Sequence, residues 1–295
     1  MQDVLNALTL GSIYLLFALG MSLAWGTIGV LNFGHGAVFM FAAFTAHLIT
    51  QHVGLSIPVL LLLGIVVGAL LSVLIQVLVF EPIQTRAASA AQGELQILVG
   101  GIGVASVLLA LAQRSTQSVP FGLPPDSFRV VAYTVGSLRI TNIQLIILAT
   151  AVVLGGAVAL WLRGSRVGLG LRGIGVDPEV ATMMGVDRRR LARGTMALAG
   201  ALAGLAGILL TFYLGAIVPE SGDSFLLRGF AAIVLGGVGT VSGTVLGALV
   251  LAAAETVVAT QTSGQWVDVV AFGLIFVMLL VRPRGLLGRK EVRRT

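Results

Sequence analysis

The chain has 295 residues, of which 57% are hydrophobic and 10% are charged, and its mean hydropathy is +1.03. A water-soluble domain carries about 25% charged residues, so this composition excludes a surface that faces water throughout and favours one that faces lipid. The formal net charge is +6, but the basic residues gather in a few loops, so membrane orientation explains them better than nucleic acid, and no nucleic-acid partner is expected. The lack of cysteine excludes disulfides, thiol catalysis and zinc–cysteine sites.

Apolar segments of about the length that crosses a membrane recur along the chain. In lipid each must satisfy its own backbone hydrogen bonds, so each is expected to be helical. Strand-like alternation is absent, which argues against a β-barrel. The sequence predicts an all-α integral membrane protein with about 8–10 transmembrane or half-membrane helices in a single transmembrane domain, 1–295. The apolar segments are 6–25, 34–51, 57–80, 95–112, 141–162, 195–214, 229–241, 243–260 and 266–281.

Arginine and lysine are distributed unevenly between two sets of loops. Segment 163–193 contains seven of them, the tail 282–295 contains six, and Arg86 adds one. The other loops contain four in total, and one of these is Arg228, in an expected outer loop at 215–228. Because Lys and Arg favour the cytoplasmic side, we expect 163–193 and the C-terminus to be cytoplasmic and the N-terminus to be extracytoplasmic.

Two glycine-rich interruptions divide apolar stretches. The first is 26–36, which contains no Asp, Glu, Lys or Arg, and the second is the turn 236–243. Stretch 229–260 is about 48 Å long as a helix, too short for two full crossings of a hydrocarbon layer about 30 Å thick, so it predicts a pair of short or re-entrant helices. Broken helices are tolerated only inside protein or beside a water-filled cavity. The two interruptions together indicate an internal repeat with broken helices.

The loop 113–140 is expected to be extracytoplasmic by the same count of basic residues. It contains Pro120, Gly122, Pro124 and Pro125, which rule out a continuous helix. Its length suits a lid or a docking surface.

A short helix is predicted in the middle of the cytoplasmic segment. Asp177 suits its N-cap, Pro178 its first position and Glu179 its first turn, while Gly185 suits its end. Two interpretations remain open at this point: a surface helix on the lipid headgroups, or a plug that docks into a partner's groove.

Catalytic motifs are absent from the sequence. A P-loop requires Gly-Lys-Ser/Thr, but Lys290 is the only lysine and Glu291 follows it. The three histidines form no His-Glu-x-x-His pattern and no serine lies in Gly-x-Ser-x-Gly. No metal site, bound cofactor or catalytic residue is therefore expected in this chain, and an enzyme is the weakest hypothesis.

A few polar groups lie at membrane depth, where an ionisable side chain is costly and is by default a functional hypothesis. The alternative is a hydrogen bond between helices that fixes their packing. Glycines four residues apart, such as Gly64/Gly68 and Gly200/Gly204, favour close internal helix packing over a dimer interface. The residues expected to line a pathway are Asn32, His35, Gly36, Gly237, Gly239 and Glu255.

Several of these elements resemble the integral-membrane permease subunits of branched-chain amino-acid-type ATP-binding-cassette (ABC) importers. The resemblance extends over nearly the whole chain, and its most specific parts are Asn32-Phe33-Gly34-His35-Gly36 and the ending Val281-Arg282-Pro283-Arg284-Gly285-Leu286-Leu287-Gly288. Gly11-Ser12-Ile13-Tyr14, the region around Asp177 and the turn 236–243 also match. Many members have Ala where this chain has Gly34.

This resemblance implies a type II ABC importer-like fold in a bacterial cytoplasmic (inner) membrane. It implies a second, usually different permease subunit, two cytoplasmic ATPase subunits that bind ATP, and an extracytoplasmic substrate-binding protein. The solutes of such importers include branched-chain and other amino acids, urea and short amides. The short helix becomes the coupling helix that enters a groove on the ATPase, with the residues Asp177, Pro178, Glu179, Val180, Ala181, Met184, Gly185 and Val186.

Two other transport mechanisms remain as alternatives on sequence grounds. A secondary transporter would carry solute without partner subunits, and its uptake would depend on a proton or sodium gradient and on Glu255. A passive channel would use the glycine-rich breaks as a filter.

Overall fold

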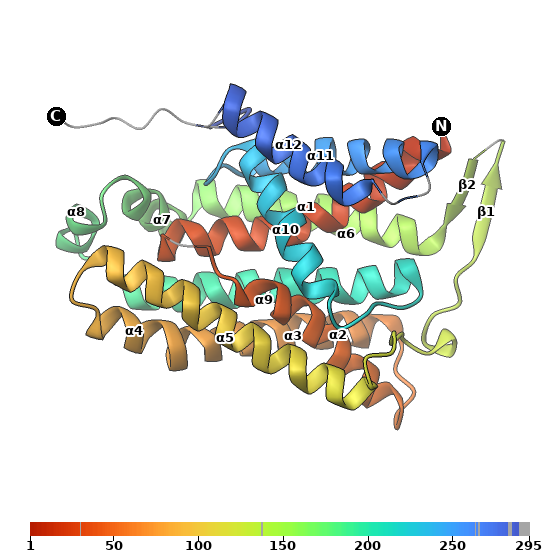
Figure 1. The fold of residues 1–295 in the computed structure, drawn as a ribbon, viewed down its shortest axis with the longest axis horizontal. Helices are drawn as coiled ribbons and strands as arrows, with labels where there is room; N and C mark the ends of the chain where they lie inside the picture. The colour runs from red at the N-terminus through yellow and green to blue at the C-terminus, as the bar shows by residue number, and fades with distance from the viewer. Residues whose placement is uncertain (30, 137, 263, 265, 283–284, 289–295) are drawn as a thin grey trace.

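The structure is a computed structural model that describes residues 1–29, 31–136, 138–262, 264, 266–282 and 285–288. Helices dominate it, and they lie roughly along one direction (Figure 1). Their bounds are α1 Gln2–Ile28, α2 Gly34–Thr50, α3 Ile57–Ile75, α4 Glu81–Arg86, α5 Ala90–Thr116, α6 Asn142–Gly164, α7 Arg166–Val176, α8 Pro178–Met183, α9 Arg188–Leu214, α10 Ser221–Gly236, α11 Val241–Gln261 and α12 Val267–Val281. A π-helical turn, Gln76–Phe80, joins α3 to α4.

All nine predicted apolar segments are helical, which confirms the predicted class of fold. Within the described ranges, six helices are long and apolar enough to cross a membrane: α1, α3 with its extension through α4, α5, α6, α9 and α11. Helices α2, α10 and α12 are shorter, with 17, 16 and 15 residues. We call the end of the bundle that holds α7 and α8 the basic end, and the opposite end the hairpin end (Figure 1).

The connection between α5 and α6 contains a small antiparallel hairpin, which the sequence analysis did not predict. Strand β1 (Ala132–Val135) pairs with β2 (Leu138–Thr141), and an isolated bridge joins Phe121 to Ile217 beyond α9. The prediction of no continuous helix in this loop is confirmed, because α5 ends at Thr116 and α6 begins at Asn142.

Helix α1 does not continue into α2 but reverses at the basic end. Gly29 ends α1 with φ 83°, a left-handed conformation that glycine adopts without strain. The chain then returns toward the middle of the bundle, where α2 begins (Figure 1). The Asn32 side-chain oxygen accepts a 2.9 Å hydrogen bond from the Gly34 N–H, one of the amide groups that a helix start leaves without a partner. Helix α2 is therefore a half-length helix that starts at mid-depth.

Helices α9 and α10 repeat this arrangement in the opposite direction. Gly215 ends α9 with φ 82°, at the hairpin end, and the chain returns to mid-depth before α10 begins. Gly29 and Gly215 are 186 residues apart, and so are the start of α1 and the start of α9. Two segments of equal spacing and opposite direction form an inverted repeat, α1–α2–α3–α5 against α9–α10–α11–α12.

The internal repeat was predicted, but its second break was placed wrongly. The equivalent of the break after α1 is the segment 215–220, not the glycine turn 236–243. That turn joins α10 to α11. The prediction of a short helix on its first side is confirmed by α10, whereas α11 has 21 residues and is of full crossing length.

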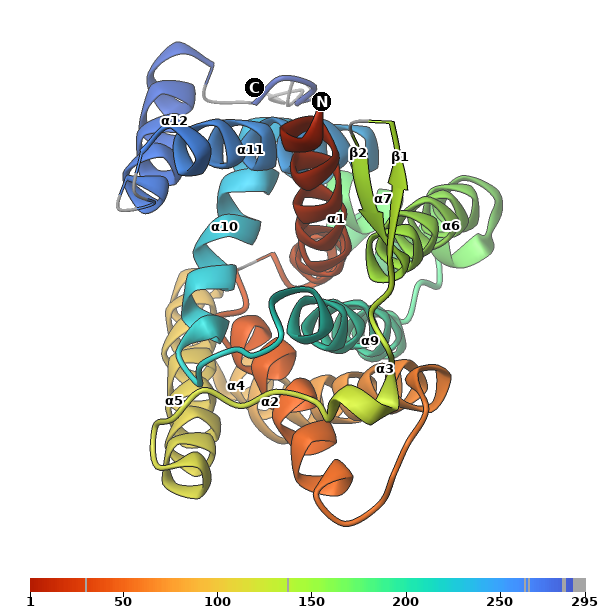
Figure 2. The same cartoon turned by 90° about the vertical axis from the view of Figure 1, so that its right-hand side faces the viewer.

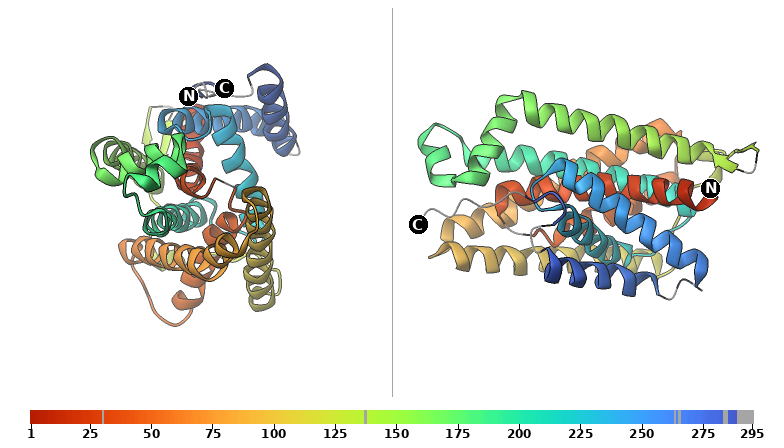
Figure 3. Two further views of the ribbon diagram at one scale, coloured as in Figure 1. Left: turned by 90° about the vertical axis from the view of Figure 1, so that its left-hand side faces the viewer. Right: turned by 90° about the horizontal axis from the view of Figure 1, so that it is seen from above.

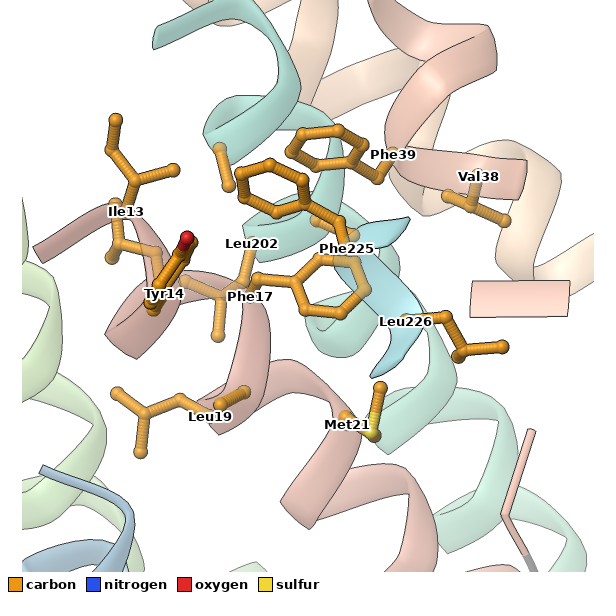
Figure 4. Close-up of a cluster of buried hydrophobic side chains, with 14 of the residues drawn as sticks. Ile13, Tyr14, Phe17, Leu19, Met21, Val38, Phe39, Leu202, Phe225 and Leu226 are labelled. Atoms are coloured by element: carbon orange, nitrogen blue, oxygen red, sulfur yellow. The ribbon is translucent and has the colours of Figure 1, made fainter. Parts of the chain in front are cut away.

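Small residues let the two repeats pack closely. A methyl group on Gly64 or Gly68 of α3 would collide with the backbone of Gly204 or Gly200 of α9. The glycines predicted from their four-residue spacing therefore meet each other, and the expected internal packing is confirmed for these two pairs. Around them, large apolar side chains fill the interior, and Figure 4 shows Phe17, Phe39 and Phe225 at its centre.

Candidate functional site

The starts of the two half-length helices meet at mid-depth. Gly36 in the first turn of α2 lies against Gly222 in the first turn of α10, and a side chain on either would collide with the backbone of the other. One turn further along, the Phe39 and Phe225 rings stack with centroids 4.5 Å apart and an interplanar angle of 15° (Figure 4). Each pair is again 186 residues apart, so the crossing lies on the pseudo-symmetry axis of the inverted repeat.

Asn32 and His35 lie in the packed interior beside this crossing. The Asn32 amide caps α2 and contacts the Met196 sulfur at 3.9 Å. The His35 Nε2 atom is 3.2 Å from the Phe17 carbonyl oxygen, and the His35 ring is tilted against the Phe17 ring. Both side chains are buried. In this conformation they join α2 to α1 and α9 and do not line an open cleft.

Glu255 belongs to a polar network that links four helices. The Tyr14 hydroxyl donates a 2.5 Å hydrogen bond to Glu255 Oε2, and Arg228 Nε lies 3.2 Å from Glu255 Oε1. Arg228 Nη2 reaches Asp268 at 2.7 Å. Glu255 is only 2% exposed, so its charge is compensated within the protein, as a buried ion requires.

This network corrects the predicted position of Arg228. Arg228 was expected in an outer loop, but it lies in α10, one turn after Ser224. Polar residues in the first two turns of α10 concealed this helix from a search for apolar runs. Tyr14 belongs to the motif Gly11-Ser12-Ile13-Tyr14, and the sequence did not indicate that it pairs with Glu255.

Gly237 and Gly239 lie in the tight turn between α10 and α11. Both have positive φ, 108° and 77°, which explains the need for glycine. The described part of the C-terminal ending packs on this turn: the Leu286 and Leu287 N–H groups donate to the Leu235 and Gly236 carbonyls at 2.8 and 2.9 Å. Residues 283–284 of that ending lie outside the described residues.

One face of the bundle exposes polar side chains at mid-depth. Seen from the hairpin end, α12, α10 and α5 follow one another along one side (Figure 2). We call this side the α5–α10–α12 face. Asp223 in the first turn of α10 and Ser106 near the middle of α5 are exposed there. Both line a small cleft of about 140 Å³, together with Phe33, Ile102, Ala105, Leu109 and Leu226.

The outward faces of α3 and α6 are apolar. The large exposed side chains of α3 and α6 include Leu62, Leu70, Val152 and Leu160, which suit contact with lipid. A carboxylate at the centre of a lipid-facing helix costs about 2.5–3.5 kcal/mol. Asp223 therefore marks the α5–α10–α12 face as one that meets water or another protein subunit.

The predicted short helix in segment 163–193 is present as α8. Asp177 Oδ1 accepts hydrogen bonds of 3.0 Å from the N–H groups of Glu179 and Val180, and Pro178 is the first residue of the helix. Gly185 has φ 89° and follows the end of the helix. The N-cap and the terminating glycine were both foreseen in the sequence.

The side chains of α8 point in two directions. Met183 and Met184 are 86% and 81% exposed, and Val180 is half-exposed. Ala181 is 6% exposed and packs against Leu171, Ile174 and Leu191 of the neighbouring helices. Ala181, a residue of the predicted coupling helix, therefore lies on the inner side of α8 and attaches α8 to α7 and α9.

No metal centre is evident in the part of the chain that the structure describes, since no three His, Asp or Glu side chains converge there. The polar groups that do converge are Tyr14, Arg228, Glu255 and Asp268, and they pair with one another. This arrangement compensates the buried charge of Glu255 and joins four helices.

Comparison with known proteins gives a consistent result. Residues 4–279 match the sequence profile of the family described as branched-chain amino acid transport system / permease component. The chain is 32% identical to the high-affinity branched-chain amino acid transport system permease protein BraD of Pseudomonas aeruginosa, with 100% of this chain and 97% of that protein covered. It is 31% identical, with the same coverage, to the permease protein LivH of Escherichia coli.

A solved structure shares the arrangement of the helices. The PsaBC complex from Streptococcus pneumoniae, solved with a Fab, matches with a TM-score of 0.50 and 12% identity over 96% of this chain and 93% of that one. At this identity the likeness concerns the fold alone.

The matched family and its relatives establish what this chain is. It is a multi-pass inner-membrane protein and a non-catalytic permease subunit of an ABC importer, and separate subunits use the ATP. The chain belongs to the branched-chain amino acid transport system / permease component family.

Proposed function

We propose that this chain forms one half of the translocation pathway of an importer for branched-chain amino acids. The α5–α10–α12 face is the part of this chain that lines the pathway. The observation that carries the proposal is the exposed Asp223 carboxylate at mid-depth on that face. The relatives BraD and LivH are both described as permeases for branched-chain amino acids, which supports the same class of solute here.

The cleft at Asp223 is smaller in volume than a complete solute-binding site. Its volume of about 140 Å³ is well below the 300 Å³ or so at which ligand pockets begin. A second permease subunit, usually a different chain, that faces α5, α10 and α12 would close it. The carboxylate suits the α-ammonium group of an amino acid, and such a group would avoid the cost of leaving Asp223 unpaired.

Helix α8 is the proposed coupling helix. Met183 and Met184 are exposed apolar residues on a short, capped helix at the basic end, and flexible methionine side chains suit a protein groove. Docking into a groove on the ATPase would cover them. The alternative, a helix lying on lipid headgroups, would leave coupling unaffected by their substitution.

The proposed orientation places the basic end in the cytoplasm. Helix α7, the start of α9 and the C-terminal tail contain most of the arginines, which favours the cytoplasmic side. The hairpin β1–β2 and the N-terminus then face outward, where an extracytoplasmic binding protein would deliver the solute. Two ATPase subunits would dock at the basic end.

Purification of the assembled complex through a tag on this chain tests the function. Co-purification of a P-loop ATPase and a second permease is expected, and in proteoliposomes leucine uptake should require ATP and binding protein. Asp223→Asn should reduce leucine uptake by about tenfold, the effect of one lost favourable charge interaction of about 1.4 kcal/mol. Gradient-driven uptake by this chain alone would overturn the proposal in favour of a secondary transporter.

A further inference from the structure

A large apolar pocket lies at the basic end, away from the α5–α10–α12 face. Its volume is about 810 Å³. Its lining residues belong to α6, α7, α9 and the connection from α8 to α9. The backbones of these elements lie next to one another at the basic end (Figure 3). We propose that this pocket binds one anionic membrane phospholipid, with its headgroup at Arg166 and Arg190 and an acyl chain between α6 and α9.

The pocket changes in character along its length. Its deep part is lined by Leu154, Val158, Leu198 and Leu202, all apolar. Its mouth holds Trp161, Arg166 and Arg190. Tryptophan favours the headgroup level of a membrane, so the mouth lies where phosphates lie and the deep part lies where acyl chains lie.

The dimensions agree with an acyl chain. Leu154 and Trp161 are seven residues apart on α6, or about 10 Å along the helix axis. One leaflet of the hydrocarbon core is about 15 Å thick. The pocket thus extends over about two thirds of a leaflet, and the neighbouring exposed residues of α6, Val152, Val153 and Leu160, are apolar and suit a lipid surround.

Charge selects the anionic class of lipid. Arg166 makes no ion pair with an acidic side chain within the described ranges, and Arg190 pairs only with the exposed Asp187 at 3.1 Å. Because two arginines are balanced by only one carboxylate, the mouth of the pocket carries a net positive charge. Basic pockets between transmembrane helices on the cytoplasmic side are suited to anionic headgroups, and arginine binds phosphate with two parallel hydrogen bonds.

The position of the pocket connects it to α8. Leu191 lines the pocket and belongs to the same apolar cluster as Ala181 of α8. Val186, in the connection from α8 to α9, also lines the pocket and packs against this cluster. A bound lipid would therefore support the segment that holds α8, independently of which solute the importer carries.

Glycine offers a way to fill the pocket without disturbing the fold. Gly194 lines it, and a methyl group at this position meets nothing within 4 Å. Gly194→Leu should therefore occupy the space of the acyl chain. Gly156 on α6 is equally open but does not line the pocket, so Gly156→Leu is the matched control.

The experiment uses the intact complex, extracted from membranes and washed in detergent, with co-purified lipids identified by mass spectrometry. Nanodiscs of phosphatidylcholine with and without phosphatidylglycerol provide the binding assay. We expect the complex to retain phosphatidylglycerol. Arg166→Gln/Arg190→Gln should weaken retention about 25-fold, because each arginine near an anionic surface contributes a factor of about five.

The controls distinguish binding in this pocket from nonspecific attraction of anionic lipid to the positively charged basic end. Arg188→Gln/Arg189→Gln removes two charges from the same turn of α9 but from residues that do not line the pocket, and it should leave retention unchanged. Gly194→Leu should lose the lipid and Gly156→Leu should keep it. Equal retention by both double variants, equal retention of phosphatidylcholine, or protection of the pocket by a protein subunit instead of lipid would overturn the proposal.

Discussion

Gly36 and Gly222 lie backbone to backbone where α2 and α10 begin, and each occupies the space that a side chain on the other would need. This contact joins the two halves of the inverted repeat at mid-depth. It also explains why α10 leaves Asp223, the next residue, on the outward face. The close approach of these two glycines therefore links the fold to the proposed pathway.

Leucine at Gly36 or Gly222 should prevent assembly. The new side chain would meet backbone atoms that cannot move aside, so the cost should exceed the usual 1–3 kcal/mol of overpacking. We expect no monodisperse complex from Gly222→Leu in size-exclusion chromatography. Gly156→Leu, on an open face of α6, should give a normal yield. A well-behaved Gly222→Leu complex with unchanged thermal stability would show that the two helices do not cross at this point.

Removing one member of the buried ion pair should cost more than removing both. Glu255→Leu alone should destabilise the protein by about 3–5 kcal/mol, because it leaves Arg228 without its buried partner. The double variant Glu255→Leu/Arg228→Leu should regain a large part of this loss, since Asp268 is 74% exposed and can be solvated. Thermal unfolding of the four proteins measures the coupling, and additive losses would contradict it.

Tyr14→Phe should have a smaller effect at the same place. It removes the 2.5 Å hydrogen bond to Glu255 but leaves the ring packed at 5.4 Å from Phe225. A hydrogen bond to a charged group contributes about 1.5–3 kcal/mol. Tyr14→Phe should therefore lower the thermal stability measurably, but by less than Glu255→Leu does. A drop of equal size would indicate that Tyr14, and not Arg228, is the main partner of Glu255.

Substitutions in α8 should separate docking from folding. Met183→Asp and Met184→Asp place charges on exposed positions, so the complex should fold while solute uptake loses its link to ATP hydrolysis. Ala181→Asp buries an unpaired carboxylate among Leu171, Ile174 and Leu191, which should destabilise the protein itself. Uptake and ATPase activity measured together test this. Normal coupling in both methionine variants would exclude docking through α8.

The helices could be predicted because lipid demands long apolar runs, and the N-cap of α8 could be predicted because Asp177-Pro178-Glu179 is a local signal. The start of α10 was missed because Ser221, Asp223, Ser224 and Arg228 interrupt its apolar character. Local patterns also cannot say which side of a helix is covered, so the sequence did not show that Ala181 lies on the buried side of α8. The equal spacing of Gly29 from Gly215 and of Gly36 from Gly222 was a signal in the sequence that would have located the second break.

Contacts between distant segments lay beyond the sequence analysis. Glu255 was recognised as a costly group at membrane depth, but its partners Tyr14 and Arg228 come from other helices, and no spacing along one chain indicates such a meeting. The same limit applied to Asn32 and His35, which the structure buries in helix packing.

Access of water to Asp223 tests the central claim most directly. The chain contains no cysteine, so single variants Asp223→Cys, Ser106→Cys and Val152→Cys can be made in the complex and labelled in membranes with a charged methanethiosulfonate reagent. Only a thiolate in contact with water reacts quickly. The account predicts labelling at positions 223 and 106, and none at position 152 on the apolar face of α6. At position 106, where Asp223 is kept, ATP-driven transport of leucine should slow the labelling. If position 223 is as unreactive as position 152, the α5–α10–α12 face does not line the pathway.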